Sequence, residues 1–440
     1  MKERQPRHSQ ASQAYEDERG NEQLFVDSIT NYATLDDIFA SNANISQKNG
    51  SLLGTKTKSS AAGTQVFEKQ REKIFAINAI KRFSALSEAR EIFRFEGSKL
   101  NLEYPLNFHR TAKCHWVSLD DNVSIYKSFE FKTAFYKNLV TCGMVWTCPV
   151  CSAKIQERRR LEIATAMDLQ YKTTGKCVMI TFTFPHTSFD SCSDLVLRQR
   201  DAFRRLRHTR LYKSTCKNIG YIGLIRSLEV VFGKNGWHPH THELWFVDGD
   251  ANAEKLKKSL IRQWRKACQN SLLLSQTDLS KISHFNRYSV DIKDFAKNSD
   301  YLQKSELGHW GADRELAKST SKQASSKGLH PFELLEKSAS GQMQYRAKYL
   351  EYSKAFFRAR QLYWTNDLKT HFQIDHLSDS AIASKTEETA FLIAILTPYD
   401  WRLIRKYDHI ANALILAVNG GSIALQNLLN QLKKLEKNND

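Results

Sequence analysis

The chain has 440 residues, of which 41% are hydrophobic and 25% are charged, so it has the composition of a globular protein with two or three domains. This composition excludes a fibrous protein, a wholly disordered chain and a mini-protein. Its 65 Lys and Arg residues against 47 Asp and Glu give a net charge of +18, which favours a polyanionic partner such as nucleic acid. Ribosomal, membrane-surface and nucleic-acid-processing roles all remain compatible with this charge.

The N-terminal part, residues 1–68, is polar and low in aromatic residues, and residues 41–64 have the Ser, Asn, Gly and Lys content of a linker. We expect this part to be mostly unstructured. The first eight residues have no apolar core, so we expect no secretory signal. The longest charge-free stretch, residues 410–432, contains too many Asn and Gln residues for a bilayer helix. A cytoplasmic protein with no membrane partner is therefore expected, with its eight Cys residues unlinked.

Hydrophobic periodicity and turn residues predict an alternation of helices and strands after residue 68. Helices are expected at residues 69–97, 154–173, 253–269 and 299–318, and throughout the part from Pro331 to the C-terminus. Strands are expected at residues 178–184, 221–232, 238–247 and 288–292. Asn235-Gly236 is a strong hairpin signal between the second and third strands. The pattern therefore predicts an α+β fold whose sheet is antiparallel and flanked by helices, followed by a helical C-terminal region.

Four Cys residues between residues 110 and 155 have the spacing of a structural zinc site. Cys148 and Cys151 form a CxxC motif, and Cys114 and Cys142 can complete a four-sulfur set, with His115 as a substitute ligand. A redox pair is the alternative, although no thioredoxin-like pattern surrounds the motif. The other four cysteines, Cys177, Cys192, Cys216 and Cys268, lack such spacing and are expected to be packing residues.

The segment HPHTH at residues 238–242 places three imidazoles on one face of a strand. With Asn235 and Gly236 as turn residues, Glu229 would lie opposite His242 and diagonal to His240 on the same face. A carboxylate and two imidazoles suit Mg²⁺, Mn²⁺ or Zn²⁺, and the coordination positions that they leave open can polarise a phosphodiester. A structural role for these histidines is the plainer alternative.

Residues 198–213 are rich in Arg, with Asp201 as the single acid. Such a cluster is either a solvated helix face or a surface that contacts phosphate. The candidates for DNA binding are Arg204, Arg205, Arg207 and Arg210.

These motifs, in this order, resemble those of plasmid rolling-circle replication initiators of the HUH endonuclease superfamily. They are WTCPVC at 146–151, ITFT at 180–183, GWHPHTH at 236–242, YLQK at 301–304, PFELL at 331–335 and RQLYW at 360–364. The resemblance implies that His240 and His242 bind a divalent metal, although Thr241 stands where the family usually has a bulky apolar residue. It also makes the strand with Thr181 and Thr183 the first motif, with a structural role.

The resemblance further implies that a Tyr on a later helix attacks DNA. Tyr301, with Lys304 one turn onward to contact phosphate, is our candidate because it follows the strand at 288–292 directly. Tyr349, within YRAKY at 345–349, is the competitor.

The implied organisation is a disordered segment (1–68), a helix with a zinc-binding segment (69–155), an HUH endonuclease domain (156–318) and a helical C-terminal region (319–440). The implied activity is metal-dependent nicking and rejoining of single-stranded plasmid origin DNA through a 5′-phosphotyrosyl intermediate, in cooperation with a host DNA polymerase and helicase. Two alternatives remain: a transposase or relaxase-like HUH nuclease, and a non-catalytic, zinc-containing nucleic-acid-binding protein.

Overall fold

A computed structural model describes residues 61–100, 109–129, 132–248, 252–295, 328–385 and 390–439. The chain divides into two compact units, Met1–Gln65 and Val66–Asp440. The helix that begins at Ala61 starts in the first unit, and the described residues from Val66 onward belong to the second. The predicted helix at 299–318, with Tyr301 and Lys304, lies outside the described residues.

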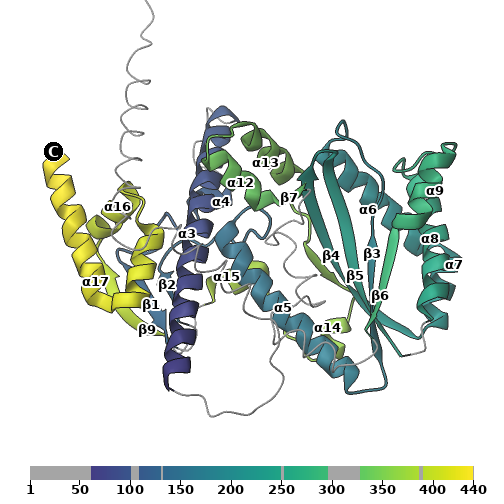
Figure 1. The fold of residues 1–440 in the computed structure, drawn as a ribbon, viewed down its shortest axis with the longest axis horizontal. Helices are drawn as coiled ribbons and strands as arrows, with labels where there is room; N and C mark the ends of the chain where they lie inside the picture. The colour runs from purple at the N-terminus through teal and green to yellow at the C-terminus, as the bar shows by residue number, and fades with distance from the viewer. Residues whose placement is uncertain are drawn as a thin grey trace, which may run out of the picture. The chain divides into compact units, whose positions relative to one another are not determined.

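The larger of the two sheets in the described part is antiparallel and has the strand order β6-β3-β5-β4-β7, with β8 also paired to β4 (Figure 1). Its strands are β3 (Lys176–Phe182), β4 (Tyr221–Gly233), β5 (Gly236–Val247), β6 (Val290–Phe295), β7 (Gly328–Leu329) and β8 (Leu362–Trp364). The α+β class with an antiparallel sheet is thereby confirmed.

Helices cover both faces of this sheet (Figure 1). They are α5 (Pro149–Tyr171), α6 (Cys192–His208), α7 (Arg210–Asn218), α8 (Ala253–Asn270), α9 (Leu279–Tyr288), α12 (Pro331–Ala339), α13 (Gln344–Ala355) and α14 (Leu368–His371). The short helix α15 (Asp379–Ser384) packs on α5. On one face, Phe203 of α6 and Trp264 of α8 pack on Phe182 of β3. On the other, Met167 of α5 and Phe372 of α14 belong to one buried apolar cluster with the sheet.

A second antiparallel sheet joins parts of the chain that are far apart in sequence. It has the order β2-β1-β9, formed by β1 (Val123–Ser128), β2 (Thr133–Lys137) and β9 (Phe391–Leu396). The remaining helices are α3 (Ala61–Leu100), α4 (Arg110–Lys113), α16 (Pro398–Lys406) and α17 (Ile410–Asn439). The helix α17 packs on this sheet, and Tyr136 of β2 donates a hydrogen bond to the carbonyl of Ile410 at 2.8 Å.

Among the described residues, α17 is the one helix long and apolar enough to cross a membrane by length and composition. It has a kink at Gly421, where φ is 60°. Its residues Ala413, Leu414, Ala417 and Val418 are buried within the protein core. These residues therefore serve as core residues.

Two sequence expectations are wrong in detail. The first helix begins at Ala61, inside the part expected to be unstructured. The part from Pro331 onward contains β8 and β9, so it is not wholly helical. The strands β1 and β2, within residues 69–155, are not among the expected strands. The apolar run of β9 is short, and a short apolar run has no periodicity that separates a strand from a helix.

Candidate functional site

The hairpin of β4 and β5 brings together a carboxylate and two imidazoles. Glu229 lies directly opposite His240 in the strand register. One carboxylate oxygen of Glu229, Oε2, is 3.4 Å from Nε2 of His240 and 3.2 Å from Nε2 of His242. The side chains of Glu229 and His242 are 4% and 5% exposed, whereas His240 is 17% exposed. The cluster is therefore buried on one side and accessible from the side of His240.

The register of the hairpin differs by two residues from the expected one. The turn residues are Lys234 and Asn235, with Gly233 paired to Gly236, so Ser227 and not Glu229 lies opposite His242. The physical reason is that Gly236 has a φ of +82°, a left-handed conformation that glycine adopts without steric cost. A two-residue shift keeps each side chain on the same face, so Glu229 still lies on the histidine face.

Neighbouring hydroxyls and a further histidine surround this cluster. The Oγ1 of Thr181 on β3 lies 2.9 Å from Nδ1 of His242, on the side of the ring away from Glu229. His330, which precedes α12 and is 3% exposed, places Nδ1 3.9 Å from Oε1 of Glu229. Sequence reasoning missed His330 because no spacing relates it to the hairpin. Its place directly before the PFELL motif was the one available signal.

His238, the third imidazole of the strand, is not part of the cluster. Its Nε2 lies 2.7 Å from Oγ1 of Thr183, and its ring stacks on His186 with centroids 4.5 Å apart. Burial, with the neighbouring imidazoles of His240 and His186, lowers the pKa of His238 to about 3. It is therefore neutral near pH 7. Thr241 points to the opposite face, where Nε2 of Gln199 donates a hydrogen bond to its hydroxyl at 3.0 Å.

The donor set of Glu229, His240 and His242 fits a divalent cation. Their ligand atoms all lie within 4.8 Å of one another, and two imidazoles with one carboxylate are a set that binds first-row divalent metals with coordination positions left open. Thr181 is placed to fix the orientation of His242, as neighbours of metal-binding histidines commonly do.

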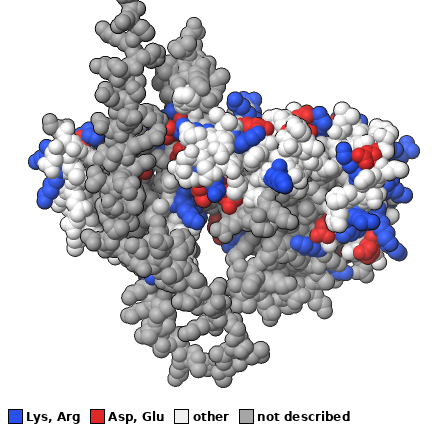
Figure 2. Space-filling view, turned by 45° about the horizontal axis from the view of Figure 1, so that its top comes forward, with Lys and Arg blue, Asp and Glu red and all other residues white. Residues whose placement is uncertain are grey.

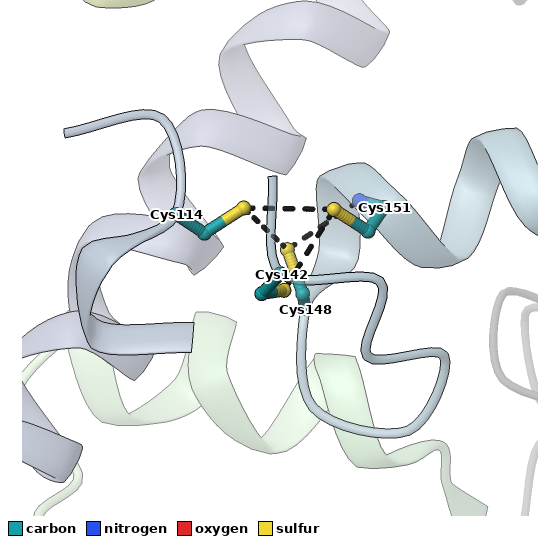
Figure 3. A group of neighbouring side chains, drawn as sticks. All are labelled: Cys114, Cys142, Cys148 and Cys151. Carbon is teal, nitrogen blue, oxygen red and sulfur yellow. Dashed lines mark hydrogen bonds between the residues drawn. The ribbon is translucent and has the colours of Figure 1, made fainter. Parts of the chain in front are cut away.

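The four predicted cysteines converge in a second cluster (Figure 3). Cys114 follows α4, Cys142 lies in the loop after β2, and Cys148 and Cys151 stand at the start of α5. The sulfur of Cys114 is 3.5 Å from that of Cys151 and 3.6 Å from that of Cys148, and Cys142 is 3.7 Å from Cys151. All four side chains are buried.

The chemistry of this buried cluster fits Zn²⁺. Hydrogen bonds from the other three thiols lower the pKa of Cys151, whereas burial raises the pKa of Cys148. Four buried thiolates repel one another unless a cation binds them, and four sulfurs are a usual structural zinc set. Nδ1 of His115 lies 3.2 Å from the sulfur of Cys114, so His115 is a neighbour of the four-sulfur set.

The four candidate DNA-binding arginines lie in two different environments. Arg204 and Arg205 are exposed but form ion pairs with Asp201, and Arg210 is exposed at the start of α7. Arg207 instead points toward the sheet and forms an ion pair with the buried Glu243. On the face shown in Figure 2, groups of basic side chains have acidic ones among them.

Of the two candidate nucleophiles, only Tyr349 lies in the described part of the chain. Its side chain is 0% exposed, and its hydroxyl donates a hydrogen bond to the carbonyl of Thr147 at 2.8 Å. Burial raises the pKa of this phenol. Tyr349 therefore occupies a core position beside the cysteine cluster.

Comparisons with known proteins place the chain in a family. The sequence model of a family described as replication protein matches residues 135–403, more than half of the chain. The chain is 26% identical over 304 residues to Protein rep of Streptomyces lividans. This alignment covers 55% of this chain and 66% of that protein. It is 32% identical over 147 residues to a neomycin resistance protein of Streptomyces cyanogenus. This alignment covers 28% of this chain and 34% of that protein.

The chain thus spans just under two thirds of the length of the first relative and about a third of the second. No solved structure matches it. The match over residues 135–403 includes both strands of the β4–β5 hairpin and three of the four clustered cysteines. The chain belongs to the replication protein family, which confirms the resemblance to plasmid replication initiators inferred from its motifs.

Proposed function

We propose that the chain is a plasmid rolling-circle replication initiator with an HUH fold, which nicks and rejoins single-stranded origin DNA. The observation that carries this proposal is the cluster of Glu229, His240 and His242 on two adjacent antiparallel strands. The family match and the net charge of +18 support a DNA substrate.

In the proposed reaction, the hydroxyl of Tyr301 loses its proton and its oxygen attacks the scissile phosphorus. A bond forms between the tyrosyl oxygen and the 5′-phosphate, the bond from phosphorus to the 3′-oxygen breaks, and the 3′-oxygen takes a proton. Lys304 contacts the phosphate and offsets its negative charge. A Mg²⁺ or Mn²⁺ ion held by Glu229, His240 and His242 would supply Lewis-acid polarisation of the phosphodiester.

Rejoining is the reverse reaction. The phosphotyrosyl bond replaces one phosphodiester with another, so attack by a 3′-hydroxyl can restore the DNA strand without a nucleotide cofactor. In the interval, the free 3′-hydroxyl is a primer for a host DNA polymerase, and strand separation calls for a host helicase. Both partners, and the cytoplasmic location that they imply, are part of the proposal.

The nucleophile is tested with single-stranded DNA that contains the plasmid origin, in the presence of Mn²⁺. We expect wild-type protein to form a covalent protein–DNA adduct, visible as a shifted band on a denaturing gel. Tyr301→Phe and His240→Ala should give no adduct while DNA binding persists, because Lys and Arg contacts supply most of the affinity. The burial of Tyr349 supports this choice of nucleophile.

Tyr349→Phe is the matched comparison. It removes one buried hydrogen bond, to Thr147, so we expect a loss of about 1 kcal/mol in stability and normal adduct formation. Adduct formation by Tyr301→Phe and not by Tyr349→Phe would make Tyr349 the nucleophile. Tight binding of DNA by the wild-type protein with no adduct would favour the non-catalytic zinc-containing protein. Cleavage without preference for the replication origin would favour the transposase or relaxase alternative.

We also propose that Cys114, Cys142, Cys148 and Cys151 hold a structural Zn²⁺. Because this metal would link the start of α5 to two loops, its loss should unfold this part of the protein. We expect Cys148→Ser to lose one equivalent of zinc, measured by atomic absorption, and to melt at a lower temperature. Cys216→Ser is the control, since Cys216 is partly exposed and lies outside the cluster. Full zinc content in Cys148→Ser would contradict the site.

A further inference from the structure

A cavity of about 360 Å³ lies on the face of the large sheet away from Glu229 and the histidines. Its lining includes Arg226 of β4, and Arg226 lies opposite both Glu243 of β5 and Tyr363 of β8 in the strand registers. Side chains alternate between the two faces along a strand, so Arg226 and Glu243 lie on the face opposite to that of Glu229, His240 and His242. The remaining lining residues come from α6, α7, β4 and the residue after β8, and they are Arg207, Tyr212, Tyr221, Leu224 and Thr365.

The charges around this cavity leave one guanidinium uncompensated. Glu243 is 1% exposed, and its two carboxylate oxygens accept hydrogen bonds from Arg207 and from the indole of Trp245. Arg207 is thus the ion-pair partner of Glu243, whose charge also acts on Arg226 without an ion pair, so two guanidiniums share one carboxylate. Within the described residues, the guanidinium of Arg226 makes no hydrogen bond, and it lies 5.0 Å from the ring centroid of Tyr363 and 6.0 Å from that of Phe203.

The guanidinium of Arg226 is half-buried in the cavity wall, so nitrogens without a protein partner can be reached from the cavity. Burial, with the nearby charge of Arg207, lowers the pKa of Arg226, but the group stays protonated near neutral pH because the ordinary value is so high. Its five donors are therefore available to an anion that enters the cavity. A phosphate matches the planar fork of a guanidinium with two parallel hydrogen bonds.

The same cavity offers aromatic and hydroxyl groups. Tyr212, Tyr221 and Tyr363 all line it, and the hydroxyl of Tyr221 lies 3.4 Å from that of Thr365. Burial raises the pKa of Tyr212 and of Tyr221, so these phenols stay neutral and add no negative charge that would repel an anion. Aromatic side chains beside an arginine are the combination that binds nucleotides, through stacking on the base and charge on the phosphate.

We propose that this cavity binds one nucleoside monophosphate group, with Arg226 on the phosphate and a tyrosine ring against the base. Its volume lies near the lower end of the roughly 300–1,000 Å³ typical of small-molecule sites, which suits a single nucleotide. The group could come from a free nucleotide or from one unit of a DNA strand. The site is separate from the proposed nicking centre, so it goes beyond that function and is tested by binding alone.

The experiment measures the affinity of the full-length protein for three probes by calorimetry or fluorescence anisotropy: thymidine 5′-monophosphate, inorganic phosphate and a short oligo(dT). Oligo(dT) has no origin sequence, so nicking does not enter the measurement. We compare wild type with Arg226→Gln. The control is Arg262→Gln, which removes an equal charge from an exposed position on α8.

We expect Arg226→Gln to weaken binding at least tenfold, because it removes charge-assisted hydrogen bonds to phosphate, while Arg262→Gln changes it less than twofold. A loss seen with thymidine monophosphate supports a site for free nucleotides, and a loss confined to oligo(dT) supports a site for one unit of the strand. An unchanged affinity of Arg226→Gln for thymidine monophosphate and for oligo(dT) overturns the proposal. So does equal affinity for inorganic phosphate and thymidine monophosphate, since the aromatic rings would then contribute nothing.

A second variant keeps the test valid if Arg226→Gln does not fold, which its melting temperature and zinc content would report. Tyr363→Leu on the short strand β8 retains the guanidinium and removes one ring. We expect at least threefold weaker binding of thymidine monophosphate with unchanged binding of inorganic phosphate. Unchanged binding of both probes would count against the proposal. Nicking of origin DNA by either variant bears only on the proposed function.

Discussion

Thr181 is placed to orient His242 of the candidate metal cluster, although it is not itself a candidate ligand. Its hydroxyl lies 2.9 Å from Nδ1 of His242, so it can hold the ring with Nε2 directed toward Glu229. We expect Thr181→Val to lower the affinity for Mn²⁺ about 10- to 100-fold, as loss of such neighbours commonly does. Titration of the protein with Mn²⁺, followed by electron paramagnetic resonance, measures this affinity.

Thr183→Val is the matched control for this prediction. It lies two residues along the same strand, but its hydroxyl contacts His238, which is outside the candidate metal cluster. Its Mn²⁺ affinity should stay close to that of the wild type. Equal losses in both variants would show that Thr181 acts through the strand as a whole, not through His242.

Residue-level prediction from the sequence works where the spacing alone decides which side chains meet. The alternation of a strand places His240 and His242 on one face, and an error of two residues in the turn leaves Glu229 beside them. His330 and Arg207 show the limit. Their environments depend on how α12 and α6 pack on the sheet, and sequence spacing holds no information about that packing.

At the scale of single elements, the β4–β5 hairpin depends on Gly236. An alanine there must adopt a φ near +82°, and its Cβ would lie 2.9 Å from Cα of Ser188 and 3.0 Å from the carbonyl oxygen of Thr187. Both atoms are backbone and cannot move aside cheaply. We expect Gly236→Ala to cost about 2–4 kcal/mol of the free energy of unfolding, measured by chemical denaturation.

Gly341 provides a control with a similar backbone and no steric conflict. Its φ is +90°, and no heavy atom lies within 4 Å of the Cβ that an alanine would add. Gly341→Ala should therefore cost only about 1–2 kcal/mol, the penalty of the left-handed conformation. If the two variants lose the same free energy, the contact with Ser188 and Thr187 contributes nothing.

Prediction of elements from the sequence succeeds for the long amphipathic helices and the alternating strands. The helix expected at 253–269 is observed as α8, at Ala253–Asn270, and the two hairpin strands are observed within three residues of their expected limits. It fails for β9 because its pairing with β1 joins residues more than 260 positions apart. No local signal specifies a partner at that distance.

At the scale of the whole molecule, the stability should fall in mild acid, partly because of His109. Its Nδ1 accepts a hydrogen bond from the amide of Thr111, its ring stacks on Phe93 with centroids 4.0 Å apart, and burial lowers its pKa to about 4. The unfolded chain takes up this proton near pH 6.5, whereas the folded protein resists it. The stabilisation is therefore complete above pH 6.5 and is lost as the pH falls toward 4.

We expect His109→Asn to flatten this dependence, because asparagine keeps a hydrogen-bond acceptor before α4 and does not titrate. Between pH 7 and pH 4, wild-type protein should lose about 1–3 kcal/mol more than the variant, measured by denaturant unfolding at each pH. His284→Asn, at an exposed position on α9, should follow the wild-type curve. A wild-type curve that matches His109→Asn would assign the acid sensitivity to other groups.

The pairing of β1 with β9 has a consequence for the order in which the protein is made. At roughly 5–20 residues per second, a ribosome synthesises β9 roughly 10–50 s after β1, and all strands of the large sheet emerge in that interval. The sheet with Glu229 and the histidines can therefore be complete on the ribosome while one edge of β1 still has no partner. An open strand edge is a template for association with other chains, so nascent chains are most exposed to aggregation in the seconds before Phe391 appears.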